Sequence, residues 1–216
     1  DVSRESRDEK KFQEHLHILS KECFVPVAAG GGICTLKDAR ALLRSGSDKV
    51  VVNSVIHENQ HVIFEIAEEF GNQCLVASVD VKKHGDDYLI WTHSGGLKLE
   101  LSLEEWFNII SGLPLGEVYL NSMDHDGTGQ GYELDLLSSI PENFPIPIIL
   151  AGGAGKYEHL AEGLLDDRVD AVATANLFAF MGDGLQKSRD FLKGQGIELP
   201  GWDIKQAKEL SGVLIN

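Results

Sequence analysis

Residues 25–32, VPVAAGGG, and residues 146–153, IPIILAGG, are two copies of one pattern, a short apolar run that ends in glycines. Their prolines, Pro26 and Pro147, are 121 residues apart. An apolar run of this length closed by glycines is typical of a buried strand followed by a tight turn. The same structural unit is therefore predicted twice in one chain.

A second pair of segments repeats at almost the same spacing. GSDKVVVNS and RVDAVATAN align Asp48 with Asp170 at an offset of 122, and Asp1 aligns with Asp124 at an offset of 123. One half of the chain thus resembles the other, unit by unit. A half built of four βα units and repeated once gives an eightfold barrel, whereas an open sheet needs no such repeat. Similar βα units alone could produce a single match, but three agreeing offsets favour the barrel.

Strands and helices are predicted to alternate along the whole chain. Strands are predicted at 25–29, 50–52, 74–80, 88–94, 117–121, 146–150 and 170–174. Helices are predicted at 4–21, from Thr35 to Gly46, at 59–70, from Ser102 to about 110, at 134–140, 157–165 and 182–193. The strands are apolar runs rather than alternating patterns, which indicates a parallel sheet buried on both faces.

The strand count leads to an expectation about the start of the chain. Six full core strands follow residue 20, and Asp1 would end a seventh. An eightfold barrel has eight strands and about 250 residues. We therefore expect residues 1–216 to form one barrel domain. The first strand, its helix and most of the second strand, about 45–50 residues on the repeat length of a βα unit, would lie upstream.

Composition excludes several classes of protein. The chain has 19 Lys and Arg against 34 Asp and Glu, a formal charge of −15, which argues against binding a nucleic-acid backbone. No apolar run is long enough to span a membrane. Cys23, Cys34 and Cys74 are odd in number and widely spaced, so they fit no disulfide framework and are expected to be reduced thiols. Neither the cysteines nor the histidines have the spacing of metal ligands. We expect a cytoplasmic protein with no metal and no cofactor.

Chemistry in a barrel takes place at the carboxyl ends of the strands. The residues predicted there are Asp1, Gly31, Gly32, Asn53, Ser54, Asp80, Asp124, Gly152, Gly153 and Asn176. Glycine turns that open a helix let backbone N–H groups approach a phosphate. Because two such turns occupy repeat-related positions, we predict two phosphate sites on opposite sides of one mouth. A ligand with a phosphate at each end would fit them.

Asp124 is the predicted acid–base residue. It follows a core strand and lies in a polar loop with Asp126, Gly127 and Thr128. A carboxylate that faces a cleft beside another carboxylate can hold a raised pKa and transfer protons. An isolated loop aspartate more often caps a turn, and that alternative stays open. Asp80 ranks below Asp124, as a ligand-binding or orienting residue.

Five segments resemble the cyclase subunit of imidazole glycerol phosphate synthase, a family of histidine biosynthesis. They are VPVAAGGGI, DKVVVNS, VASVDVK, LNSMDHDGTGQGY and IILAGGAGKYEHLAEGL, and the resemblance runs from Asp1 to about Gly196. It implies a (βα)8 barrel of two similar halves, in agreement with the repeat. It also implies a glutaminase partner whose ammonia passes through the barrel to a bisphosphorylated ribulosyl formimino carboxamide ribotide, which is converted to imidazole glycerol phosphate.

The resemblance also implies roles for individual residues. Two aspartates do the acid–base work. One matches Asp124, while the other, and the Lys after it, belong to a first strand with no counterpart here. Phosphate contacts are implied at Gly32, Asn53, Ser54, Gly152, Gly153 and Asn176. Lys49 matches a residue at the lower entrance through which ammonia passes, and Asp48 beside it faces the glutaminase. Without the first strand, the chain alone is not expected to turn over.

Departures from the family pattern keep other functions open. Asn176 replaces the family's usual Ser, Ala151 stands where Ser is common, and the loop THSGGLKLEL lacks a frequent Thr-Gly ending. These differences favour, to some extent, related barrels that amidate sugars in surface-polysaccharide synthesis. A two-phosphate sugar isomerase without a glutaminase partner, and a non-catalytic barrel that only binds its partner, are the further alternatives.

Overall fold

The computed structural model describes residues 8–175, 177 and 184–199, so Asp1 and Asn176 lie outside the described residues. The strands are β1 (Ala28–Gly30), β2 (Lys49–Val52), β3 (Leu75–His84), β4 (Asp87–Thr92), β5 (Leu97–Ser102), β6 (Glu117–Ser122), β7 (Ile148–Ala151) and β8 (Ala171–Val172). The helices are α1 (Glu9–Glu22), α2 (Leu36–Arg44), α3 (Ser54–Glu58), α4 (His61–Phe70), α5 (Leu103–Ile110), α6 (Tyr157–Leu164) and α8 (Gly184–Gly194), with 3-10 turns η1 (Asn72–Cys74) and η2 (Leu134–Ser139). No helix within the described ranges is long and apolar enough to cross a membrane.

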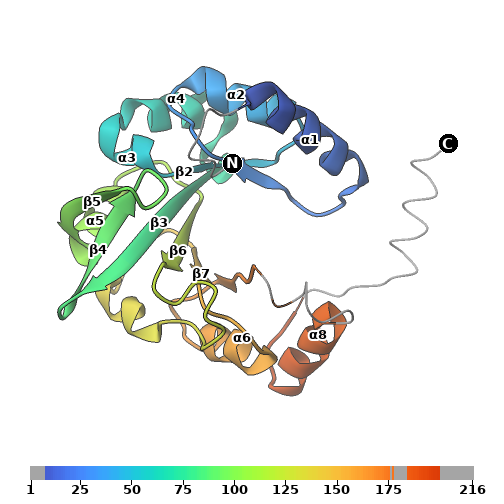
Figure 1. Cartoon of the computed structure of the whole chain (residues 1–216), viewed down its shortest axis with the longest axis vertical. Helices are drawn as coiled ribbons and strands as arrows, with labels where there is room; N and C mark the ends of the chain where they lie inside the picture. Colours follow the sequence, from blue (N-terminus) through green and yellow to red (C-terminus); the bar gives the residue numbers. More distant parts are fainter. Residues whose placement is uncertain (1–7, 176, 178–183, 200–216) are drawn as a thin grey trace.

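Six parallel strands form one curled sheet in the order β1-β2-β3-β6-β7-β8. The helices lie on its convex side, with α1, α2 and α4 over one end and α6 and α8 over the other (Figure 1). This is the architecture of a TIM-type (βα)8 barrel, of which the described residues supply six strands. The barrel predicted from the repeat is confirmed.

Three predicted elements differ from the structure. The segment 88–94 is β4, but it forms a hairpin with a second strand, β5, which the sequence analysis missed. The segment 134–140 is a 3-10 helix rather than an α-helix. The helix predicted at 59–70 is α4, and it is preceded by a short helix, α3, that was not predicted. Both capping boxes, Thr35 with Asp38 and Ser102 with Glu105, begin their helices as predicted.

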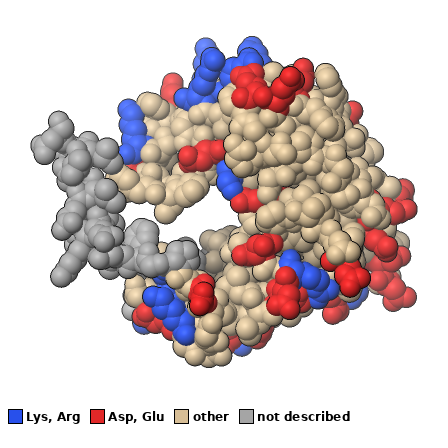
Figure 2. Space-filling model, turned by 180° about the vertical axis from the view of Figure 1, so that it is seen from behind, with Lys and Arg blue, Asp and Glu red and all other residues tan. Residues whose placement is uncertain are grey.

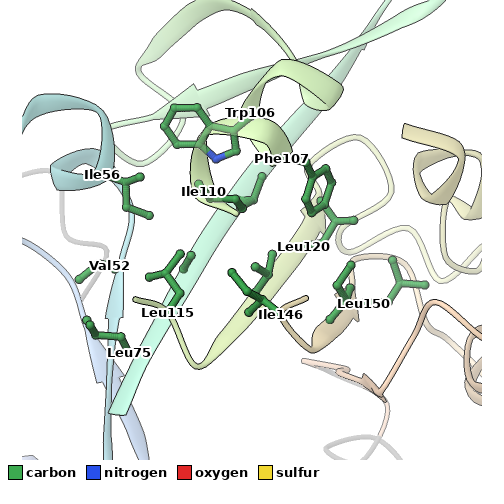
Figure 3. Packing of buried hydrophobic residues seen from close by; sticks show 14 of the residues in the cluster. Val52, Ile56, Leu75, Trp106, Phe107, Ile110, Leu115, Leu120, Ile146 and Leu150 are labelled. Atoms are coloured by element: carbon green, nitrogen blue, oxygen red, sulfur yellow. The ribbon is translucent and has the colours of Figure 1, made fainter. Parts of the chain in front are cut away.

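The best-packed part of the core lies between α5 and the sheet. Phe107 and Ile110 of α5 are fully buried, and so is Leu120 of β6. Figure 3 shows these side chains converging over the strands. Phe107 also makes an edge-to-face contact with Phe144, with ring centroids 4.7 Å apart. Burying side chains of this size contributes about 2 kcal/mol each, which fixes α5 on the sheet.

The strands are not apolar on both faces, contrary to the sequence prediction. Burial alternates along β2, β6 and much of β3, and except for Val51 the less buried positions carry polar or charged side chains. Side chains alternate between the two faces of a strand, so these residues share the concave face. The space-filling view is hollowed at its centre, where acidic and basic side chains border the opening (Figure 2). The concave face is therefore the polar one.

The internal repeat is also present in the hydrogen bonds. The carboxylate of Asp48 accepts a 2.8 Å bond from the Val27 N–H, just before β1. The carboxylate of Asp170 accepts a 2.9 Å bond from the Ile148 N–H, at the start of β7. Each aspartate thus ties the strand that follows it to the preceding parallel strand, at matching places in the two halves.

Candidate functional site

The two glycine turns adopt matching backbone conformations. Gly31 and Gly32 follow β1 with φ angles of 111° and 73°, and Gly152 and Gly153 follow β7 with 92° and 106°. These left-handed angles favour glycine. A Cβ at Gly153 would also collide with the carbonyl oxygen of Gly131. The two turns predicted from sequence therefore lie at the same end of the parallel sheet, 121 residues apart in the chain.

Each turn borders a pocket. The first pocket, of about 370 Å³, lies between the Gly31–Gly32 turn, the end of β2 and the β4–β5 turn. It brings together five predicted site residues, Gly31, Gly32, Asn53, Ser54 and Asp80. The second pocket, of about 240 Å³, lies between the Gly152–Gly153 turn, the loop 126–129 and residues 173–175.

Asp80 lies at the centre of this end of the sheet. Its two carboxylate oxygens accept hydrogen bonds from neighbouring strand ends, one from Asn53 Nδ2 at 3.2 Å and one from Asn121 Nδ2 at 3.0 Å. Burial raises the pKa of this carboxyl, the bond from Asn121 opposes the rise, and the negative charge of Asp126 adds to it. A carboxyl group in this state is suited to proton transfer.

Asp126 and Tyr119 connect Asp80 to the second pocket, and both line that pocket. Burial raises the pKa of Tyr119, and the charges of Asp126 and Asp80 raise it further. The three groups are therefore close enough to interact electrostatically. The sequence analysis named neither Tyr119 nor Asn121, although their period-two spacing along β6 places both on the concave face.

Asp124 follows β6, at the end of the sheet that carries Asp80 and Asn121. Its side chain is exposed, and Oδ2 accepts a 2.9 Å hydrogen bond from the Lys83 N–H on β3. The carboxylate thus continues the β3–β6 pairing beyond the end of β6. Such a contact is typical of a capping aspartate, and Asp124 is not among the described residues that line either pocket, while its acid–base role stays a prediction.

The loop that carries Asp126 is held by a nearly buried carboxylate. Glu133 has a side-chain exposure of 10% and accepts 2.8 Å hydrogen bonds from the hydroxyls of Tyr88 and Ser122. The Gly131 carbonyl bonds to His125 Nδ1 at 2.8 Å, and the Gly131 N–H donates to the Gly153 carbonyl. These contacts fix the loop against the second glycine turn.

The opposite end of the sheet carries the predicted entrance residues. Lys49, at the start of β2, forms an ion pair with Glu117, at the start of β6, and both are partly buried. This pair lies on the concave face, at the amino ends of the strands. Asp48 is exposed beside it, with its carboxylate engaged by Val27.

Fold and site together define a class of protein, a TIM-type barrel with two glycine-lined pockets and a partly buried carboxyl group on the lining of the first. Residues 1–183 match the family described as "Histidine biosynthesis protein". The chain belongs to this family.

Curated relatives are similar over most of the chain. One is 40% identical over 98% of this chain and 79% of its own length, and is provisionally named imidazole glycerol phosphate synthase subunit hisF2, from Parasynechococcus marenigrum. Two others, named imidazole glycerol phosphate synthase subunit HisF, come from Chlorobium limicola and Pelodictyon phaeoclathratiforme. They are 37% and 38% identical over 91% of this chain and 78% of their own length.

Proposed function

We propose that this protein is the cyclase subunit of an imidazole glycerol phosphate synthase. It would use ammonia from a glutaminase partner to form imidazole glycerol phosphate from a bisphosphorylated ribulosyl formimino carboxamide ribotide. The observation that carries the proposal is the pair of repeat-related glycine pockets, with Asp80 on the lining of the first and Tyr119 and Asp126 on the lining of the second. The names of the relatives favour this function over a sugar-amidating barrel or a sugar isomerase.

The geometry supports a division of labour within the site. One phosphate would bind in the first pocket, at Gly32, Asn53 and Ser54, and the other in the second pocket at Gly152 and Gly153. Backbone N–H groups at such turns bind phosphate without a basic side chain, which suits a chain of net charge −15. A substrate held at both ends would place its central part over Asp80.

Asp80 is the group we propose for proton transfer. It faces the region between the pockets, and Asn53 and Asn121 orient both of its oxygens. The assignment of this role to Asp124 from sequence stays a prediction, which the same experiment tests. Ammonia would arrive from the amino ends of the strands, past the pair formed by Lys49 and Glu117.

The test is ammonia-dependent formation of imidazole glycerol phosphate by the intact protein, with Asp80→Asn and Asp124→Asn compared. Removing a proton-transfer group costs about 10²–10⁴-fold in rate, so Asp80→Asn should fall by that factor and Asp124→Asn by much less. The reverse order would support the assignment from sequence. Wild-type protein without any turnover of this substrate, with ammonia or with glutamine and a glutaminase subunit, would contradict the proposed function.

A further inference from the structure

The first pocket presents a charge problem for a phosphate. Its described lining includes the carboxylates of Glu58 and Asp80, and contains no Lys or Arg among those residues. A phosphate dianion placed there would meet two like charges at short range, which is unfavourable in a partly buried site. Backbone N–H groups alone would leave this repulsion in place, and a cationic side chain on the lining would offset it.

His93 is the side chain on this lining that can become a cation. It lies in the β4–β5 turn, where the backbone at His93 and Ser94 has φ angles of 53° and 55°. Consecutive non-glycine residues with positive φ are strained, and such strain concentrates at functional sites. The turn thus holds the imidazole over the pocket at some conformational cost.

The surrounding contacts fix the His93 ring and its backbone. Nε2 lies 2.9 Å from Glu58 Oε1, and Nδ1 lies 3.1 Å from Thr92 Oγ1. The His93 N–H donates a 3.0 Å hydrogen bond to Ser54 Oγ. Ser54 Oγ in turn donates a 3.3 Å hydrogen bond to Asn53 Oδ1, so the β4–β5 turn, Ser54 and Asn53 are linked along the edge of the pocket.

We propose that His93 is a phosphate-binding residue of the first pocket and that, as an imidazolium, it supplies the pocket's positive charge. Glu58 acts as the counter-ion that holds the ring in place. The other titratable groups that face it on the described lining are Asp80 from β3 and Cys34 from the segment after β1. The inference rests on the proposed function, because it assumes that the first pocket binds a phosphate group.

The test uses the whole chain labelled with ¹⁵N and titrated with inorganic phosphate at about pH 6.5, so that amide shifts report each pocket separately. Asn tolerates positive φ as His does, so His93→Asn removes the cation and spares the backbone. We expect about tenfold weaker phosphate binding at residues 31–33 and 53–54, with binding at 127–129 and 153–155 unchanged. The matched control is His61→Asn, because His61 forms an exposed pair with Glu65 on α4, and it should change neither pocket.

A second arm measures pH dependence in the wild-type chain, with inorganic sulfate as an anion of constant charge. Imidazole changes charge between pH 5 and 8, so sulfate affinity at the first pocket should fall as pH rises from about 6 to 8, relative to the second pocket. This experiment needs no variant, so it tests the proposed role of His93 even if His93→Asn does not fold. Equal pH dependence at both pockets, or equal loss at both in His93→Asn, would overturn the inference alone. No anion binding at either pocket in the wild-type chain would instead count against the proposed function.

Discussion

Two aspartates forty-four residues apart along the chain differ in what surrounds their carboxylates. Asp80 lies within β3, is partly buried and has two amide donors, whereas Asp124 is exposed and accepts a backbone N–H. Burial is the larger cause of the raised pKa of Asp80, and a neighbouring charge is the smaller one. The environment, rather than the residue type, therefore distinguishes the two carboxylates.

Substitutions of neighbouring residues should shift the pKa of Asp80 in either direction. Asp126→Asn removes a negative charge, so the pKa should fall, while Asn121→Ala removes a donor to the carboxylate, so the pKa should rise. Carboxyl ¹³C shifts of Asp80 against pH measure both. Shifts in the same direction for the two variants would contradict the arrangement described here.

The sign of the stability effect follows from the raised pKa of Asp80. The folded chain holds this proton more tightly than the unfolded chain does, so the contribution is present in full below the unfolded pKa. It is lost as pH rises through the folded pKa. We expect the free energy of unfolding of the wild-type chain to fall across that window more steeply than that of Asp80→Asn, as measured by urea unfolding at a series of pH values.

At the scale of elements, the glycine turn after β7 should tolerate substitution poorly. Gly153 has a φ of 106° and lies against the carbonyl oxygen of Gly131. We expect Gly153→Ala to lower the free energy of unfolding by about 1–3 kcal/mol, as measured in urea. The control is Gly194→Ala at the end of α8, where a Cβ would meet nothing within 4 Å and should be neutral or slightly stabilising.

The β4–β5 hairpin joins the two sides of the site. Its Tyr88 bonds to Glu133, which holds the Asp126 loop, and its turn contacts the first pocket through His93. Tyr88→Phe leaves Glu133 with one hydroxyl donor fewer and should cost about 1–2 kcal/mol in unfolding free energy. Amide shifts should change in loop 123–131 if the hairpin positions that loop, and a change confined to β4 would exclude this role.

At the scale of the whole molecule, the repeat predicts equal effects in the two halves. Asp48→Ala and Asp170→Ala each remove one carboxylate bond to a preceding strand, so each should cost about 1 kcal/mol in unfolding free energy. The two sites share no hydrogen-bond partner, so the double variant should show the sum of the two effects. A large difference between the single variants would mean that the halves are not energetically equivalent.

The same pair of variants tests the predicted partner contact of Asp48. Its structural role matches that of Asp170, so any additional loss of affinity for a glutaminase subunit in Asp48→Ala must come from the interface. Titration calorimetry of both variants with that subunit measures the difference. Equal affinities would remove Asp48 from the docking surface and leave it only as a tie between strands.

The barrel, its two halves and the glycine turns could be predicted without a structure, because apolar periodicity, turn chemistry and the 121-residue spacing are all local or repeated signals. The sequence also placed Asn53, Ser54 and Asp80 at strand ends. Only the tertiary structure decided that Asp80 is the enclosed carboxylate, that Asp124 caps a strand pair, and that His93 lies over the first pocket. Desolvation and hydrogen bonding come from residues brought together by the curled sheet, and no single stretch of sequence records which side chains will share that space.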